Sequence, residues 1–278
     1  MQRQKSFSNN NPTLFLVATP IGNLDDMTFR AVETLKKVDL IYAEDTRVSG
    51  KLMKHFEIKG SLRTYHDFNK EVKTTEIINE LISGKDIAII SDAGYPLISD
   101  PGYFLIREAI KEDINVVSIP GANALLAALV VSGIPPHPFT FYGFLDHKEG
   151  KRKKELTSLV NHQETLVFYE SPHRITKTIK NIYEIFGERE LVIARELTKK
   201  YEEIIRGTTK SLLDIQDLKG EIVIVVSGKK ARIEESNLTI LEEVNKLIAS
   251  GLSSKEAIKQ VAKNRKILKN DVYMEYHK

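Results

Sequence analysis

The chain has 278 residues, a net charge of +3, 41% hydrophobic and 28% charged residues. This length allows two domains with separate cores, and the composition is ordinary for a globular protein. No apolar run is long enough for a membrane span, and the N-terminal residues lack the apolar segment of a secretory signal. The absence of cysteine excludes disulfides and thiolate catalysis. We therefore expect a cytoplasmic protein with a disordered tail over residues 1–12.

Strand-like and helix-like segments alternate through the first half of the chain. Short β-branched runs predict strands, and amphipathic runs that follow capping residues predict helices. The predicted strands cover residues 14–18, 40–43, 87–90 and 116–119, and the predicted helices cover 28–37, 71–83, 103–110 and 123–131. This βαβα order is typical of a mainly parallel sheet covered by helices.

The segment Ser132–Pro138 interrupts this pattern with one glycine and three prolines. Such a cluster of turn residues indicates a boundary, so we expect one α/β domain over residues 13–133 and a second over 134–228. The second half has predicted strands at 139–144, 165–169, 191–194, 202–206 and 221–227, and predicted helices from 152 and over 175–186. The wider spacing of these helices favours a mixed sheet.

Basic residues gather in two places, at residues 148–154 and along the C-terminal segment. Residues 229–232 predict a linker and residues 238–249 and 254–263 predict helices, so we expect a small basic helical domain over 229–278. Lys255, Lys259, Lys263 and Lys266 have the spacing of one helical face. Two such clusters favour a polyanionic partner, although solvated surfaces or packing against the second domain would give the same pattern.

Several kinds of chemistry are disfavoured by missing motifs. There is no G-x-x-x-x-G-K-[ST] phosphate loop, no G-x-G-x-x-G dinucleotide fingerprint and no G-x-S-x-G nucleophile elbow. The seven histidines are scattered without a ligand spacing, so we expect no metal.

The remaining chemical signal lies in loops that follow predicted strands. The longest is Ser91–Gly102, which contains two Asp-Xaa-Gly units directly after the apolar strand 87–90. The carboxyl ends of parallel strands meet at one sheet edge, where ligands of α/β proteins bind. We therefore expect these loops to form one site.

Six motifs at these strand ends resemble a known family. They are T-P-I-G-N, A-E-D-T-R, S-D-A-G-Y-P-L-I-S-D-P-G, P-G-A-N-A, F-Y-E-S-P-H-R and A-R-E-L-T-K, within residues 13–227. In this order they resemble the tetrapyrrole-methylase superfamily of S-adenosylmethionine enzymes, and within it the branch called ribosomal RNA small subunit methyltransferase I. Members of that branch methylate the ribose 2'-hydroxyl of a cytidine in the decoding region of 16S rRNA.

The resemblance implies the fold, the methyl donor and the partner. The expected fold is two α/β domains with a donor-binding cleft between them, plus a small C-terminal helical domain. The expected donor is S-adenosyl-L-methionine, and the expected partner is small-subunit ribosomal RNA in the assembled 30S subunit. A homodimer is also implied. Carried over by position, the donor-binding residues would be Pro20, Asp92, Ala93, Gly94, Tyr95, Ile98, Pro120, Asn123, Ala124, Tyr169 and Ala194.

Methyl transfer to a hydroxyl requires alignment of three atoms and removal of a proton. Candidates for the proton acceptor are Asp45, Asp100, His173 and Glu196, although the carboxylates could instead cap helices or form ion pairs. A guanidinium fork matches phosphate geometry, so Arg47, Arg174 and Arg195 are candidates for RNA contacts, with internal ion pairs as the alternative. The other RNA candidates are Lys151, Arg152, Lys153, Lys154, Lys255, Lys259, Lys263 and Lys266.

Two other functions fit parts of the sequence. A small-molecule, corrinoid-type or diphthamide-pathway methylase of the same superfamily would share the strand-end loops. The F-Y-E-S-P-H-R and A-R-E-L-T-K motifs and the basic C-terminal segment argue against it. A non-catalytic RNA-binding module would share the basic clusters, but the intact loops at Asp92 and Pro120 argue against a vestigial site.

Overall fold

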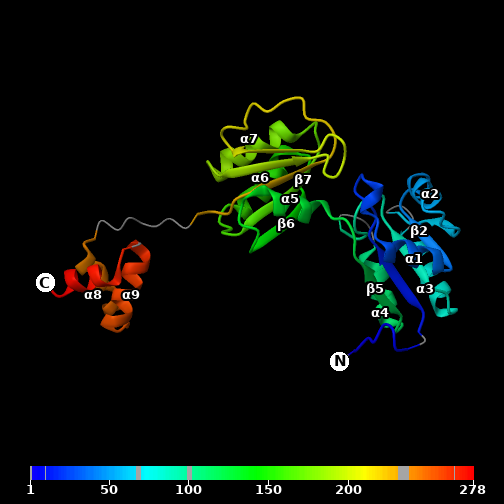
Figure 1. The fold of residues 1–278 in the computed structure, drawn as a ribbon, viewed down its shortest axis with the longest axis horizontal. Coiled ribbons are helices and arrows are strands. Elements are labelled where there is room, and N and C mark those ends of the chain that lie inside the picture. Colours follow the sequence, from blue (N-terminus) through cyan, green and yellow to red (C-terminus); the bar gives the residue numbers. More distant parts are fainter. Residues whose placement is uncertain (1, 10, 67–69, 99–101, 231–237, 266) are drawn as a thin grey trace. The chain divides into compact units, whose positions relative to one another are not determined.

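The computed structural model describes residues 2–9, 11–66, 70–98, 102–230, 238–265 and 267–278. The chain forms two compact units, Met1–Lys229 and Lys230–Lys278. The first unit contains two five-stranded sheets with helices, and the second contains helices (Figure 1). The predicted α/β class with C-terminal helices is therefore confirmed. The division of the first unit at residue 133 stays a prediction.

The first sheet is parallel throughout and has the strand order β3-β2-β4-β1-β5. Its strands are β1 (Thr13–Val17), β2 (Leu40–Ala43), β3 (Ser61–Thr64), β4 (Ile87–Ile90) and β5 (Asn115–Ile119). In the register of the central strands, Leu14 of β1 lies opposite Ile87 of β4 and Val116 of β5. Strands β2 and β4 are buried at every position, as expected for strands covered on both faces.

Helices cover both faces of this sheet. They are α1 (Phe29–Lys37), α2 (Thr46–His55), α3 (Lys70–Ile82) and α4 (Tyr103–Lys111), with a short 3-10 helix at Leu24–Asp26 before α1. Leu35 of α1 and Met53 of α2 belong to one buried cluster, whereas Ile77 of α3 and Leu105 of α4 belong to another. The two clusters contain alternate residues of the strands, which is the consequence of the two-residue period of a β-strand.

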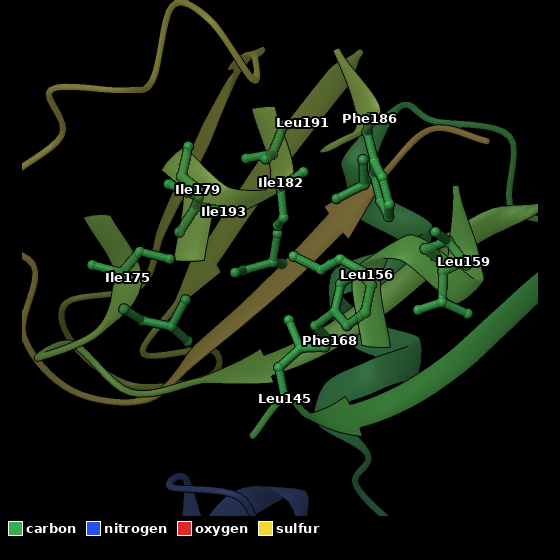
Figure 2. Close-up of a cluster of buried hydrophobic side chains, with 14 residues drawn as sticks. Leu145, Leu156, Leu159, Phe168, Ile175, Ile179, Ile182, Phe186, Leu191 and Ile193 are labelled. Carbon is green, nitrogen blue, oxygen red and sulfur yellow. The ribbon is translucent and has the colours of Figure 1, made fainter. Parts of the chain in front are cut away.

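The second sheet is mixed, as its sequence predicted, and has the order β6-β7-β10-β8-β9. Only β6 and β7 pair in parallel. Its strands are β6 (Phe139–Phe144), β7 (Thr165–Glu170), β8 (Glu190–Arg195), β9 (Glu203–Thr208) and β10 (Ile222–Val226), and two of its helices are α6 (Glu149–Leu159) and α7 (Ile175–Phe186). Side chains of α6 and α7 pack with Phe168 and Ile193 on one face of the sheet (Figure 2).

Helix α5 (Ala124–Ser132) covers the other face of the second sheet. Its Ala128 and Leu129 are buried with Val192, Val223 and Val225. The sequence of α5 is apolar on every side, yet Leu126, Val130 and Val131 are exposed in the described chain. The residues just after the last strand of the first sheet therefore close the core of the second.

Besides the short 3-10 helix, three elements escaped the sequence prediction. The first is α2, since the motif A-E-D-T-R was expected to form only a loop. The Asp45 side chain accepts a hydrogen bond from Arg47 N and caps this helix. Strand β3 and helix α10 (Lys269–Tyr276) were also not predicted. Helix α6 begins at Glu149, three residues before the predicted start.

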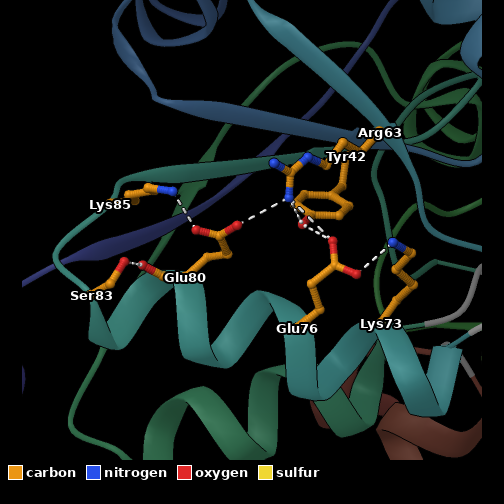
Figure 3. A network of polar contacts seen from close by, with 7 residues as sticks. All are labelled: Tyr42, Arg63, Lys73, Glu76, Glu80, Ser83 and Lys85. Carbon is orange, nitrogen blue, oxygen red and sulfur yellow. Dashed lines mark hydrogen bonds and ion pairs between the residues drawn. The ribbon is translucent and has the colours of Figure 1, made fainter.

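A polar network joins the edge strand β3 and its neighbour β2 to α3 (Figure 3). Arg63 Nη1 donates to Glu76 Oε1 at 3.2 Å, to Glu80 Oε1 at 3.1 Å and to Tyr42 Oη at 3.3 Å. Lys85 pairs with Glu80. Burial raises the pKa of Tyr42, whereas the hydrogen bond from Lys85 lowers the pKa of Glu80. The network ties the edge strand β3 to the sheet.

The second unit contains α8 (Ile240–Ala249), α9 (Ser254–Arg265) and α10. They enclose a small core that includes Val244, Ile258 and Val272. Thr239 and Glu242 form a capping box at the start of α8. No helix in the described ranges is long and apolar enough to cross a membrane.

Candidate functional site

A cavity of about 350 Å³ lies in the first unit, where loops of both sheets meet. It is lined by Ile21, Ala93, Gly94, Tyr95, Ile98, Asn123, Ala124, Phe144, Tyr169, Glu170, Ser171, Pro172, Leu197, Gly220, Glu221, Ile222 and Val223. The lining is mostly apolar with a few polar groups, which is typical of small-molecule sites of about 300–1,000 Å³.

The loop after β4 forms one wall and is fixed by backbone bonds to the loop after β1. Thr19 N donates to Gly94 O at 2.9 Å, and Gly94 N donates to Thr19 O at 3.1 Å. The Ser91 hydroxyl donates to Gly94 O at 3.1 Å. Gly94 has φ +76°, a conformation that favours glycine, and a Cβ at this position would contact Ile21. The wall is therefore preformed.

The loop after β5 is held against the same wall. Gly121 N donates to the Tyr95 hydroxyl at 3.3 Å, which joins the β5 loop to the β4 loop. A Cβ at Gly121 would lie 2.9 Å from Ala18 Cβ, so only glycine allows this close approach. The Asn123 side chain accepts a hydrogen bond from Leu126 N and caps α5, which begins at the cavity.

The second sheet contributes an aromatic and acidic wall. The ring of Tyr169 lies 4.9 Å from the ring of Phe141 and 5.5 Å from that of Phe144. The buried Glu170 accepts a hydrogen bond from Ser171 N at 2.7 Å and forms an ion pair with Arg174 at 2.7 Å. These bonds fix the start of the F-Y-E-S-P-H-R loop.

Seven of the eleven predicted donor-binding residues line the cavity. They are Ala93, Gly94, Tyr95, Ile98, Asn123, Ala124 and Tyr169. The other four, Pro20, Asp92, Pro120 and Ala194, do not line it. Pro20 is buried, Pro120 is exposed, and Ala194 is fully buried in the core beneath α5. Asp92 accepts a hydrogen bond from Asp45 N at 3.2 Å. Desolvation raises the pKa of Asp92.

Sequence reasoning missed the wall formed by Gly220–Val223. The strand β10 is antiparallel to its neighbours, so its N-terminal end lies at the edge where β7 and β8 end. The expectation that ligands bind at the carboxyl ends of parallel strands does not apply to this segment. Phe144 was missed too, although it ends the parallel strand β6, where that rule does apply.

Comparison with known protein families agrees with a ligand cavity formed by the strand-end motifs. Residues 13–213 match the family described as Tetrapyrrole (Corrin/Porphyrin) Methylases. The chain belongs to this family. It is 48% identical to the ribosomal RNA small subunit methyltransferase I of Bacillus subtilis, over 100% of this chain and 99% of that protein. The protein of the same name from Halalkalibacterium halodurans is 46% identical, with the same coverage.

Solved structures of low sequence identity share the methylase fold. A crystal structure of diphthine synthase has a TM-score of 0.61 and 14% identity, over 79% of this chain and 90% of that one. The methyltransferase CobJ has a TM-score of 0.58 and 18% identity, over 80% of this chain and 96% of that one. The resemblance inferred from the strand-end motifs is confirmed.

The acidic candidates of this tetrapyrrole methylase are engaged in local bonds. Asp45 pairs with Arg47 at 2.6 Å, and the hydrogen bonds from Arg47 lower the pKa of Asp45 to about 2. A carboxylate with so low a pKa is a weak base. Glu196 pairs with Lys199 at 2.9 Å, which also lowers its pKa. His173 is exposed, and Asp100 lies outside the described residues.

The three candidate arginines differ in how free their guanidinium groups are. The Arg47 side chain is 88% exposed despite its pair with Asp45. Arg174 is held by Glu170, and Arg195 donates to Glu203 Oε2 and to Lys219 O at 3.1 Å. Arg47 therefore presents its guanidinium to solvent, whereas Arg174 and Arg195 stabilise loops of the methylase.

Helix α6 presents only part of its predicted basic cluster. Lys151 and Lys154 are exposed, and Lys153 lies within 3.0 Å of both Glu149 and Glu184. Arg152 is buried and donates to Asn181 Oδ1 at 2.8 Å. The expectation that Arg152 contacts RNA is therefore wrong, because its side chain is buried between α6 and α7.

In the helical unit, Lys255, Lys259 and Lys263 are exposed along α9. The opposite side of α9 carries the buried Ala257, Ile258 and Val261. Lys266, predicted on the same face, lies outside the described residues. Within the ranges that the structure describes, no three metal-binding side chains come together.

Proposed function

We propose that this tetrapyrrole methylase transfers a methyl group from S-adenosyl-L-methionine to the ribose 2'-hydroxyl of a cytidine in the decoding region of 16S rRNA. The observation that carries the proposal is the full-length similarity to proteins named ribosomal RNA small subunit methyltransferase I, together with the preformed cavity. We further propose the assembled 30S subunit as the substrate, a homodimer as the active form, and the cytoplasm as its location.

The cavity has the size and chemistry to hold the donor. Tyr169 and Phe144 offer aromatic surfaces for the adenine ring, and Ile21 and Leu197 offer apolar contacts. Helix α5 begins at Ala124 in the lining, and the N-terminus of a helix favours a carboxylate such as that of the donor. We therefore retain the seven lining residues of the predicted set as donor-binding residues.

The donor supplies an activated methyl group, so the protein mainly has to position the acceptor. Correct alignment of the reacting atoms accounts for much of the acceleration in such displacements. The paired states of Asp45 and Glu196 disfavour both as proton acceptors, which leaves His173 as the candidate among the described residues. His173 is exposed, and it comes directly after Ser171 and Pro172, which line the cavity.

Exposed cations provide the proposed RNA contacts. They include Lys151 and Lys154 on α6 and the three lysines of α9, whose side chains are all exposed. Arg47 adds an exposed guanidinium at the start of α2. Phosphate contacts of this kind bind RNA through the release of counterions, so their contribution falls with salt.

A direct test uses methyl-labelled S-adenosylmethionine and purified small subunits that lack the modification. We expect one labelled nucleotide, a cytidine in the decoding region with the methyl group on its ribose. Free 16S rRNA in a parallel reaction tests whether the assembled subunit is needed. Label on a base, or no label on RNA, would overturn the proposal.

A further inference from the structure

The A-R-E-L-T-K segment has an unusual backbone beside the cavity. Glu196 has φ +50° and Thr198 has φ +67°, and neither residue is glycine. Leu197 lies between them and lines the cavity. Such strained conformations persist only where the surrounding structure holds them, and they gather at functional sites. We call residues 195–199 the strained loop.

The strained loop is bonded to the turn that forms the missed wall of the cavity. Glu196 N donates to Glu221 O at 3.0 Å, and Glu221 N donates to Glu196 Oε1 at 3.1 Å. Lys199 Nζ lies 2.9 Å from Glu196 Oε1 and 3.1 Å from Glu221 Oε2. One carboxylate oxygen of Glu196 therefore accepts from both the wall and the lysine.

Two glycines allow these contacts by their lack of a side chain. A Cβ at Gly220 would overlap the carboxylate of Glu196, and a Cβ at Gly22 would overlap the side-chain carbons of Lys199. Gly220 lines the cavity, and Gly22 follows the lining residue Ile21. Glu196 and Lys199 thus contact backbone from both sides of the cavity.

We propose that Glu196 is a positioning residue, whose carboxylate holds the Gly220–Glu221 turn in the shape that the methyl donor requires. The proposal rests on the proposed function, because it takes S-adenosylmethionine as the ligand of the cavity. It assigns Glu196 no proton transfer. The Glu196 side chain is only 19% exposed, and Glu221 N and Lys199 both donate to its Oε1.

Three variants test this role. Glu196→Ala removes the acceptor for Glu221 N and the partner of Lys199, whereas Glu196→Gln keeps an amide oxygen as acceptor and loses the charge. Glu164→Gln is the matched control, since the Glu164 side chain is 29% exposed, accepts a hydrogen bond from the Thr140 hydroxyl at 3.0 Å and does not line the cavity. Calorimetry gives the dissociation constant for S-adenosylmethionine, and hydrogen exchange gives the protection of the Glu221 amide.

We expect Glu196→Ala to weaken donor binding at least 10-fold and to increase exchange of the Glu221 amide at least 10-fold. Glu196→Gln should lie between Glu196→Ala and the wild type, and Glu164→Gln should stay within twofold of the wild type in both measurements. In methyl transfer, the KM for the donor should rise while kcat at saturating donor stays within threefold. Should Glu196→Ala fail to fold, Glu196→Gln alone still has to show weaker donor binding and faster exchange.

Wild-type affinity in both Glu196 variants would overturn the proposal. So would a 100-fold loss of kcat with an unchanged KM, which would indicate a proton acceptor. A wild-type protein that does not bind S-adenosylmethionine would refute the proposed function instead. In that case the exchange of the Glu221 amide still tests the positioning contact, and unchanged protection in Glu196→Ala would refute it.

Discussion

Replacement of Arg152 by methionine should destabilise the protein without directly affecting RNA binding. Arg152 is 2% exposed, and its guanidinium donates to Asn181 Oδ1 at 2.8 Å, to Asp146 O at 3.3 Å and to His147 O at 3.2 Å. Methionine keeps most of the side-chain volume but removes all three bonds. The acceptors then remain at least partly buried without this donor.

The expected loss follows from those three bonds. A buried polar group that loses its partner costs about 1–3 kcal/mol. We take about 2 kcal/mol for the short bond to Asn181 and about 1 kcal/mol for the two longer, partly buried bonds together. A total of about 3 kcal/mol corresponds to a decrease in Tm of roughly 6–12 °C for a domain of this size.

Thermal unfolding followed by circular dichroism measures this loss, with Lys154→Met as the control on the same helix. Lys154 is exposed, so its replacement should leave Tm within about 2 °C, because surface substitutions change stability by less than about 0.5 kcal/mol. If Lys154 contacts a phosphate, the same control should reduce the slope of log affinity against log salt by about 0.7–0.9. An Arg152→Met variant with unchanged Tm and a reduced salt slope would refute this assignment.

Three further substitutions, one of them with a matched control, test other contacts. Asp45→Asn should become less destabilising as the pH falls, because the pKa of Asp45 is about 2 in the folded state. The ion pair of Asp45 contributes fully to folding stability above about pH 4, and this contribution is lost toward pH 2. Urea unfolding at several pH values measures this, and a pH-independent difference would contradict it. Gly22→Ala should lower stability by about 1–3 kcal/mol and weaken donor binding, since φ is +144° and a Cβ would overlap Lys199. Gly84→Ala, also at positive φ but facing open space, should cost about 1–2 kcal/mol and leave donor affinity unchanged. Equal donor affinity in the two variants would argue against the Lys199 contact. Arg63→Met should cost about 1–2 kcal/mol in urea unfolding, because its partners are only partly buried, and an unchanged midpoint would show that the network adds no stability.

The strands of the fold were largely predictable, because most form β-branched runs between turn residues. Strand β3 escaped because it pairs only with β2 at the sheet edge, and Ser61–Thr64 contains a single large apolar residue. Helix α2 escaped because its capping Asp45 lies in a motif that also reads as a loop. Local sequence does not show which of these alternatives tertiary packing selects.

The site was predictable where backbone geometry forms it. Gly94 and the loop around it were identified from the turn residues, and the structure places them in the cavity lining. Arg152 was not predictable, because its charged neighbours in the sequence are exposed and only the packing of α7 shows its burial. Gly220 was missed because the antiparallel strand β10 begins, rather than ends, at the cavity.

The parallel pairing of the first sheet also sets an order of assembly during synthesis. Strand β1 is made first, yet Thr13 pairs with Asn115, so the sheet is incomplete until β5 has left the ribosome. Contacts between segments so distant in sequence form slowly. The cavity requires still more, because Gly220–Val223 is synthesised after every other part of its lining. A nascent chain can therefore complete its first sheet before it can bind a ligand, and ligand binding would report that the first unit is finished.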